Sequence, residues 1–513
     1  MESWKREVFF WILVLLFSIT VPVIILNAKG YRFDKNRGVF VHSGTITFKS
    51  NPQTVDIKLN DELFESKKLN RINSSFNVSG IVPGEYNLQI SAPDFQTWSK
   101  KTQVHSGLAS EFWNVLLVKN NYEKTNLDTP GIYKFFTSPR NNLMAYTLNS
   151  ENDLLVNIFN LENNTVSQEI NLAGWQLIED AKKENIEWSP DNSFLSIPVK
   201  KLAENSAQKE KNIPSKAQPK KTFAEVPAEY EYSYFIYDFK NKNSLNLTEV
   251  LNKKNVHDVR WDPRESGFLF FLEDGILFRL DIKNPQNISQ IASDVSSYDL
   301  SGSSVYYSQN SGLLYKNSLD GKSDPVQITN NFPDSQNVKI SSVVVYDDSR
   351  IALTLENKDF YIYNKGDYGD YYRKLADKIE EAHFSDDGKR ILFWSNNEIS
   401  VYFLREQLSQ PIREENELQN ITRYSEPIKN VQWFKDYEHV IFNSGRWIKI
   451  IEIDPRDHAN CMDLANTQTL NPFVIYNGAL EKMYFIDTKD AVANLFSITF
   501  PEKTTFLGIE IGG

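Results

Sequence analysis

Hydrophobic and polar positions are distributed unevenly along this chain. Residues 8–26, VFFWILVLLFSITVPVIIL, contain no charged residue, and their only hydroxyl residues are Ser18 and Thr20. At a rise of roughly 1.5 Å per residue, a helix of this length covers most of a bilayer core of about 30 Å. No comparable apolar run occurs later in the sequence. The pattern therefore predicts a cytoplasmic tail and membrane anchor in residues 1–29, followed by a water-soluble remainder.

A cleaved signal peptide is the alternative interpretation of this apolar run. The run is longer than the roughly 7–15 apolar residues of a usual signal peptide. A small-x-small cleavage site is also missing, because Leu26 stands where a small residue is needed in Leu26-Asn27-Ala28. We therefore expect a retained anchor. Pro22 does not contradict it, because transmembrane helices tolerate proline.

A change of period follows a juxtamembrane connector at residues 30–43. From residue 44 to residue 118, short segments alternate apolar and polar positions, as in VDIKL at 55–59 and YNLQI at 86–90. Turn pairs separate them, such as Asn60-Asp61 and Pro83-Gly84. Alternation of this kind, interrupted at short intervals by turn residues, predicts a small β-sandwich.

The order GTITFKSNP, VDIKLNDEL and FNVSGIVPGEYNLQISAPDFQTW resembles the PEGA domain. The matching parts are the turn Ser50-Asn51-Pro52, the hairpin start at residues 83–86, and Phe95 with Trp98. The tetrapeptide PQTV at 52–55 departs from the family's pattern. Ser74-Ser75 also replaces the usual Thr-Pro. The resemblance implies a surface-exposed sandwich that binds or spaces, with no catalytic residues.

A repeated phrase runs through residues 122–513. It combines an aromatic-rich strand, a Ser/Asp-Pro-like turn and another apolar strand. The clearest copies are FFTSPRNNLMAYT, IEWSPDNSFLSIP, VRWDPRESGFLFF and AHFSDDGKRILFW. We distinguish eight copies, most of them about 40 residues apart, which is the period of a four-stranded propeller blade. The pattern predicts an all-β body with eight blades, or seven as the alternative. We expect the turns to be stabilised by Asp191, Asp262, Asp386 and Asp387.

The phrase resembles the TolB-type propeller repeat. Its nearest matches are Ser189-Pro190-Asp191 and the segment SDDGK at 385–389. This resemblance covers about three-quarters of the chain. It implies a fold and not an activity, because one fold hosts many functions.

The orientation of the anchor rests on two opposing observations. The flank after the apolar run has more basic residues than the flank before it: Lys29, Arg32, Lys35 and Arg37 against Lys5 and Arg6. A bare count would place the body in the cytoplasm. We nevertheless expect a cytoplasmic N-terminus and an extracytoplasmic body. The N-terminal charges adjoin the run directly, and the resembled domains are mostly extracytoplasmic.

One segment interrupts the repeats. Residues 200–229, KKLAENSAQKEKNIPSKAQPKKTFAEVPAE, are rich in lysine, alanine, glutamate and proline and have no period. The composition predicts a disordered insertion between two strands of the second blade. Its lysines could bind an anionic surface, but interleaved glutamates favour a solvated loop.

Charge and cysteine content exclude some classes of function. The chain has 56 basic and 67 acidic residues and a formal charge of −11, which argues against nucleic acid as a partner. Cys461 is the only cysteine, so no intrachain disulfide forms. We expect Cys461 to be a small buried residue.

The sequence contains no recognisable catalytic or metal-binding motif. The six histidines are scattered, and no metal-binding pair, nucleophile elbow, phosphate loop or calcium loop occurs. His257 and His383 precede turn phrases, and we expect structural roles for both. We accordingly expect no enzyme activity, no metal and no cofactor.

The most plausible contact surface is the aromatic segment DYGDYYR at residues 367–373. Tyrosines beside aspartates and an arginine are typical of surfaces that contact a sugar or a peptide. The candidate binding residues are Tyr368, Tyr371, Tyr372 and Arg373. The alternative is a polar, solvent-facing blade edge.

Two function classes remain open. The first is a membrane-anchored, extracytoplasmic scaffold whose propeller binds protein, peptide or glycan at the cell envelope. The second is an envelope-glycan hydrolase or lyase, since two acids on different blades leave no sequence motif. We favour the scaffold.

Overall fold

The computed structural model describes residues 3–35, 37–64, 67–70, 75–148, 153–178, 185–203, 230–332, 339–367, 369–500, 505–506 and 509–510. Strands account for 56% and helices for 7%, and an apolar helix stands at the N-terminus. The predicted fold class, mostly β with an N-terminal helix and a propeller-like body, is confirmed. The chain forms two compact units. The first holds residues 1–123, 398–467 and 499–513, and the second holds residues 124–397 and 468–498.

The N-terminal helix α1 spans Ser3–Ala28 and contains Pro22. Its segment Trp4–Ala28 is long and apolar enough to cross a membrane, and its most apolar part is not buried. A signal sequence would share these properties. The hydroxyls of Ser18 and Thr20 donate to the carbonyl oxygens of Val14 and Leu16, each at 2.8 Å. These polar groups are therefore satisfied within the helix, as a lipid environment requires.

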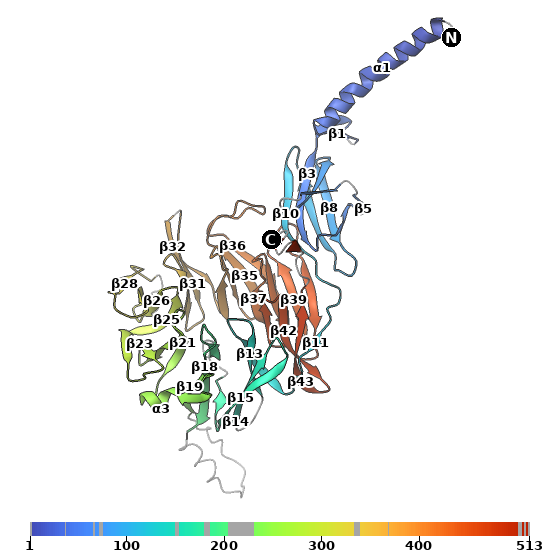
Figure 1. The fold of residues 1–513 in the computed structure, drawn as a ribbon. Coiled ribbons are helices and arrows are strands. Elements are labelled where there is room, and N and C mark those ends of the chain that lie inside the picture. Colours follow the sequence, from blue (N-terminus) through green and yellow to red (C-terminus); the bar gives the residue numbers. More distant parts are fainter. Residues whose placement is uncertain are drawn as a thin grey trace, which may run out of the picture. The chain divides into compact units, whose positions relative to one another are not determined.

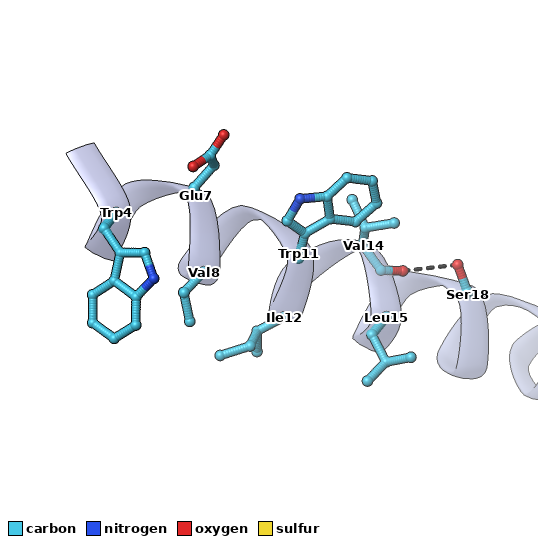
Figure 2. A pocket seen from close by; sticks show the side chains of 8 residues that line it. All are labelled: Trp4, Glu7, Val8, Trp11, Ile12, Val14, Leu15 and Ser18. Carbon is cyan, nitrogen blue, oxygen red and sulfur yellow. Dashed lines mark hydrogen bonds between the residues drawn. The ribbon is translucent and has the colours of Figure 1, made fainter.

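A shallow groove marks the surface of the first turns of α1 (Figure 2). Trp4, Val8, Ile12 and Leu15 project from the helix, and Glu7 lies on its other side. The groove belongs to the outside of a lone helix. Its lining comes from α1 alone, so we do not interpret it as a ligand site.

A β-hairpin and a β-sandwich follow α1 in the first unit. The hairpin consists of β1 (Tyr31–Asp34) and β2 (Val39–His42). The first sandwich sheet has the order β10 (Ala109–Leu116), β3 (Gly44–Asn51), β7 (Ser75–Ile81) and β6 (Lys67–Asn70). The second has the order β5 (Glu62–Leu63), β4 (Asp56–Leu59), β8 (Gly84–Ser91) and β9 (Trp98–Val104). Alternating positions form the sandwich core, for example Ile57 with Leu59 and Leu88 with Ile90.

The first unit also contains six strands of the body and a short C-terminal strand pair. The body strands are β35 (Glu398–Phe403), β36 (Leu418–Arg423), β37 (Ile428–Trp433), β38 (His439–Ser444), β39 (Trp447–Glu452) and β40 (Cys461–Asn466). The pair is β44 (Thr505–Phe506) and β45 (Ile509–Glu510). Strands β37 to β40 form one antiparallel sheet in chain order. Strand β9 of the sandwich contacts the end of this sheet, where the Trp98 indole N–H donates to Glu452 at 2.8 Å.

The second unit is built from consecutive antiparallel sheets (Figure 1). One sheet combines β11 (Thr125–Asn126), β43 (Val492–Thr499), β42 (Lys482–Lys489) and β41 (Val474–Asn477). The next holds β12 (Ile132–Thr137), β13 (Leu143–Leu148), β14 (Asp153–Asn160) and β15 (Thr165–Ala173). A third holds β16 (Gln176–Leu177), β17 (Glu187–Trp188), β18 (Phe194–Leu202), β19 (Tyr230–Asp238) and β20 (Asn243–Asn246), followed by helix α3 (Leu247–Leu251).

The remaining sheets of this unit repeat the same order of four strands. They are β21 (His257–Trp261), β22 (Phe268–Glu273), β23 (Ile276–Asp281) and β24 (Ile288–Ala292); β25 (Val295–Ser301), β26 (Ser304–Gln309), β27 (Leu314–Ser318) and β28 (Val326–Gln327); β29 (Ile340–Asp347), β30 (Arg350–Leu355), β31 (Phe360–Gly366) and β32 (Gly369–Ala376). The pair β33 (Glu381–Phe384) and β34 (Arg390–Trp394) follows.

Strand pairing between the two ends of the body is characteristic of a propeller. The early strand β11 pairs antiparallel with the late strand β43, with Asn126 opposite Phe496. One sheet is thus built from both ends of the body, which fastens the array of sheets. The count of eight blades stays a prediction.

The tryptophan of the repeated phrase connects neighbouring sheets. Trp188 donates its indole N–H to the carbonyl oxygen of Phe136 at 3.1 Å. Trp261 donates in the same way to Glu187 at 2.9 Å. Both tryptophans are buried, so each adds apolar contact to the hydrogen bond. This explains why an aromatic residue precedes the Ser-Pro and Asp-Pro turns.

The turns of the phrase have the expected carboxylate bonds. Asp191 accepts from the Ser189 hydroxyl and the Ser193 backbone N–H, each at 2.9 Å. Burial alone would raise the pKa of Asp191, but hydrogen bonds from Ser193 and Ser189 lower it to about 2. Asp387 accepts from Ser385 in the same manner at 2.6 Å. Asp386 differs from the expectation: the bond found for it uses its carbonyl oxygen, which accepts from Tyr346 at 3.0 Å.

Two sequence expectations need correction. Residues 200–202 belong to strand β18, where Leu202 pairs with Tyr230, so they are not part of a loop. Residues 204–229 of the predicted insertion lie outside the described residues. The expectation of a buried Cys461 is wrong, because this residue begins the edge strand β40 and is exposed.

Candidate functional site

The predicted contact segment lies on β32, the last strand of its sheet. Tyr368 falls outside the described residues. Tyr371 pairs with Asn364 of β31, Tyr372 with Tyr363 and Arg373 with Ile362. Because successive side chains of a strand point to opposite faces, Tyr371 and Arg373 share one face and Tyr372 lies on the other.

Tyr372 packs into the interior and not into a contact surface. Its ring lies 5.6 Å from that of Phe332 and 5.7 Å from that of Tyr363. Its buried hydroxyl has no hydrogen-bond partner in the described part of the chain, and burial raises the pKa of Tyr372. The structure therefore does not bring Tyr372 together with Tyr371 and Arg373. A binding role for the segment stays a prediction.

A polar pocket of about 490 Å³ lies in the second unit, beside the turns of two successive sheets. Its lining consists mainly of charged and hydroxyl side chains from the β21–β22 turn, β23, the β25–β26 turn and the segment from β27 to β28. These residues are Arg264, Glu265, Arg279, Ser303, Ser304, Lys316, Asn317, Ser318, Leu319, Asp320, Ser323, Asp324 and Val326.

Arg279 is the fixed cation of this polar pocket. Its Nε and Nη2 donate to the same carboxylate oxygen of Asp262, at 3.0 and 2.8 Å. Asp262 is completely buried and also accepts from the backbone N–H groups of Arg264 and Glu265. The guanidinium carbon lies 3.9 Å from the centre of the Phe268 ring, a cation–π contact. These contacts hold the Arg279 guanidinium in place.

The polar pocket is also lined by a second cation, Lys316, and by hydroxyl residues of the segment from β27 to β28. Lys316 bonds to Asp348, which also accepts from the Tyr306 hydroxyl at 2.6 Å. Burial alone would raise the pKa of Asp348, but the bond from Lys316 lowers it. The buried Asn317 accepts from the hydroxyl of Ser323 at 2.7 Å.

The sequence patterns did not indicate this pocket, although both of its turns lie in copies of the repeated phrase. One turn belongs to the copy VRWDPRESGFLFF, and the other belongs to residues 297–308, SYDLSGSSVYYS, which are a weaker one of the eight copies. Arg279 and Lys316 lie outside those phrases, on later strands of each sheet. The signal that could have indicated the pocket is a basic residue at an equivalent place in two adjacent sheets.

A charged network connects strands of consecutive sheets in the second unit. The Nε of Arg260, on β21, donates to Glu187 of β17 at 3.2 Å. Its Nη1 lies 3.7 Å from Asp299 of β25, which also accepts from the backbone N–H of Val345 at 2.8 Å. Burial raises the pKa of Glu187 despite Arg260, and the Glu187 carboxylate raises the pKa of Arg260. The network thereby links four sheets.

The histidines singled out in the sequence are engaged with neighbouring side chains. His257 lies 3.3 Å from the Asp258 carboxylate. The ring of His383 contacts that of Trp394 edge-on, with 5.1 Å between centroids. Among the side chains that the structure describes, no group of three or more His, Cys, Asp or Glu could hold a metal ion.

No protein-family model matches the chain, and no curated protein matches it. Among solved structures it is similar to the Dos1 propeller, at 10% identity and a TM-score of 0.44, over 73% of this chain and 94% of that one. The Cps50 (Swd1) propeller domain of Myceliophteria thermophila has 10% identity and a TM-score of 0.39, over 74% and 99%. Dipeptidyl peptidase 4 of Porphyromonas gingivalis has 9% identity and a TM-score of 0.43, over 72% of this chain and 58% of that one. At this level the comparisons carry no argument, and the propeller architecture rests on the sheet order and strand pairing.

Proposed function

We propose that this protein is a membrane-anchored scaffold whose propeller binds a polar segment of a protein or peptide partner at the cell envelope. Helix α1 holds the chain in the membrane with its N-terminus in the cytoplasm and the body outside. The sandwich acts as a PEGA-like spacer, and the TolB-type propeller presents the binding surface.

The polar pocket is the observation that carries this proposal. Arg279 and Lys316 are fixed by Asp262 and Asp348, so binding need not first order these long side chains. The exposed Asp320 and Asp324 add acidic groups at the rim. Cations, carboxylates and hydroxyls together complement the backbone and mixed side chains of a polypeptide.

The attachment of the sandwich supports a spacer role. Strand β9 contributes the buried Lys100, which donates to three carbonyl oxygens of the loop after β39. Gln410 bonds to strand β10 at Ala109 and Glu111, at 3.1 and 3.0 Å. Several polar contacts thus fasten the sandwich to this part of the body, which favours a rigid connection over a loose tether.

Site-specific photo-crosslinking in the native membrane tests the proposed binding surface. A crosslinking residue replaces Ser303 at the pocket, and a matched control replaces the exposed Glu162 on the β14–β15 turn. We expect a discrete adduct at residue 303 only. The substitution Asp324→Arg should weaken it, whereas Glu162→Arg should not. The same adducts at both positions, or none at 303, would contradict the proposal.

A turnover assay distinguishes the scaffold from the alternative of a hydrolase or lyase. The protein is incubated with envelope polysaccharides and with peptides, and binding and product formation are measured together. Binding without product supports the scaffold. Product formation that disappears when a pair of acidic residues is replaced by amides would establish the enzyme instead.

A further inference from the structure

We propose that the aromatic face of the β1–β2 hairpin lies in the headgroup region of the membrane that α1 crosses, on the side of the body. This inference rests on the membrane anchoring proposed above. It adds a second membrane contact, made by a sheet face and not by the helix.

The hairpin register places its aromatic rings on one face. Tyr31 pairs with His42, and Phe33 pairs with Phe40. The ring centroids are 5.2 Å apart in the first pair and 5.4 Å apart in the second. Phe33 and Phe40 nevertheless remain 50% and 40% exposed. Two large apolar rings thus form an exposed strip within a short, ordered element.

Part of the opposite face of the hairpin lies against the sandwich. Asp34 is buried, and Arg32 lies so close to Gly80 of β7 that a Cβ there would meet its Nε at 3.1 Å. The sandwich therefore covers Arg32 and Asp34, whereas Val39, which pairs with Asp34 on the same face, remains 50% exposed. On the aromatic face, the His42 ring lies so close to Gly107 of the β9–β10 loop that a Cβ there would meet its Nδ1 at 3.2 Å. The exposed part of that face is therefore the pair Phe33–Phe40.

The hairpin is held at the end of the helix. Strand β1 begins at Tyr31, shortly after α1 ends at Ala28 (Figure 1). The Nη1 of Arg32 donates to the side-chain oxygen of Asn27 at 2.6 Å and to its carbonyl oxygen at 3.1 Å. Ser43, just after β2, donates its hydroxyl to the carbonyl of Gly30 at 2.6 Å. The aromatic strip therefore stays next to the point where the chain leaves the apolar core.

Charge and residue type both fit the bilayer interface. Residues 29–43 contain the basic residues Lys29, Arg32, Lys35 and Arg37 and a single acidic residue, Asp34. The excess of positive charge attracts anionic headgroups, and aromatic rings are enriched at this depth of a membrane. If this face of the hairpin lay in water, the rings of Phe33 and Phe40 would instead form an unfavourable exposed apolar surface.

Depth-dependent fluorescence quenching in full-length protein tests this contact. In a Cys461→Ser background, a single Phe40→Cys carries an environment-sensitive dye, and the matched control carries it at Leu63→Cys, which is 56% exposed on β5. The protein is reconstituted in vesicles of zwitterionic lipid with an anionic lipid and a headgroup-labelled quencher. We expect quenching at residue 40 to be about threefold stronger than at residue 63. Lys35→Gln with Arg37→Gln should reduce the quenching at residue 40.

The possible outcomes separate the inference from the anchoring on which it rests. Vesicle flotation of the same samples reports anchoring. Protein that floats with vesicles but shows equal quenching at residues 40 and 63 overturns the hairpin contact alone. Protein that does not float overturns the anchoring and the hairpin contact together.

Discussion

Lys100 of the sandwich forms a buried ion pair with Glu452 of strand β39, with 2.8 Å between Nζ and Oε1. The Lys100 side chain has no exposed surface. Its ammonium also donates to the carbonyl oxygens of Asp454, Arg456 and His458, at 2.9, 2.8 and 2.6 Å. A buried charge is tolerated only when it is paired and hydrogen-bonded, and this one is both.

Replacement of Lys100 by Met should destabilise the protein by about 3–5 kcal/mol, because it leaves the Glu452 carboxylate buried without its cation. Lys101→Met is the matched control, since the adjacent Lys101 is exposed. Urea unfolding of both variants measures the difference. Addition of Glu452→Gln to Lys100→Met should recover part of the loss. Equal midpoints for Lys100→Met and Lys101→Met would show that the pair does not fasten the sandwich.

Stability should depend on pH through His439 and Asp436, which are 2.8 Å apart. Burial alone would lower the pKa of His439, but the Asp436 carboxylate raises it. Burial alone would raise the pKa of Asp436, but His439 lowers it. The stabilisation that protonated His439 provides is present below the ordinary histidine pKa of about 6.5. It is lost as the pH rises through the raised pKa of His439 in the folded protein. The aspartate contribution is present above its ordinary pKa of about 3.9 and is lost as the pH falls.

We therefore expect the melting temperature to fall as the pH rises above the ordinary histidine pKa of about 6.5, and His439→Gln should reduce this fall. His458→Gln, at an exposed histidine, serves as the control. A scanning calorimetry series over this range measures the effect. An unchanged slope in His439→Gln would show that another group controls the pH dependence.

Deletion of residues 1–29 should release the protein from the membrane without unfolding the body, because the strongly apolar run lies within that segment. Fractionation and circular dichroism of the truncated chain check both parts. Leu15→Arg provides a subtler variant, since a charge at the centre of a span costs about 2.5–3.5 kcal/mol on insertion scales. Aggregation with loss of the β signal would contradict the prediction.

Replacement of residues 204–229 by a short turn should change the melting temperature little. Strands β18 and β19 pair continuously up to Leu202 and Tyr230, so their ends already lie side by side. The composition of the segment offers little apolar surface to bury. Limited proteolysis of the intact protein should cut here first. A fall of many degrees on deletion would show that the segment packs on the body.

The sequence alone was sufficient for features that depend on neighbouring residues. Helix α1 follows from an uninterrupted apolar run, and the Ser189–Asp191 turn follows from residues within reach of one another along the chain. Alternation in β8 likewise indicated which residues face the sandwich core.

Tertiary structure decided what those patterns contact. Lys100 occupies an inward position of β9 between Trp98 and Thr102, and only the approach of Glu452 from a distant sheet explains a lysine there. Tyr372 lies inside because Phe332 and Tyr363 cover one face of β32. The polar pocket brings together Arg279 and Lys316 from two different sheets. Such relationships depend on residues far apart in the chain, so local periodicity carries no information about them.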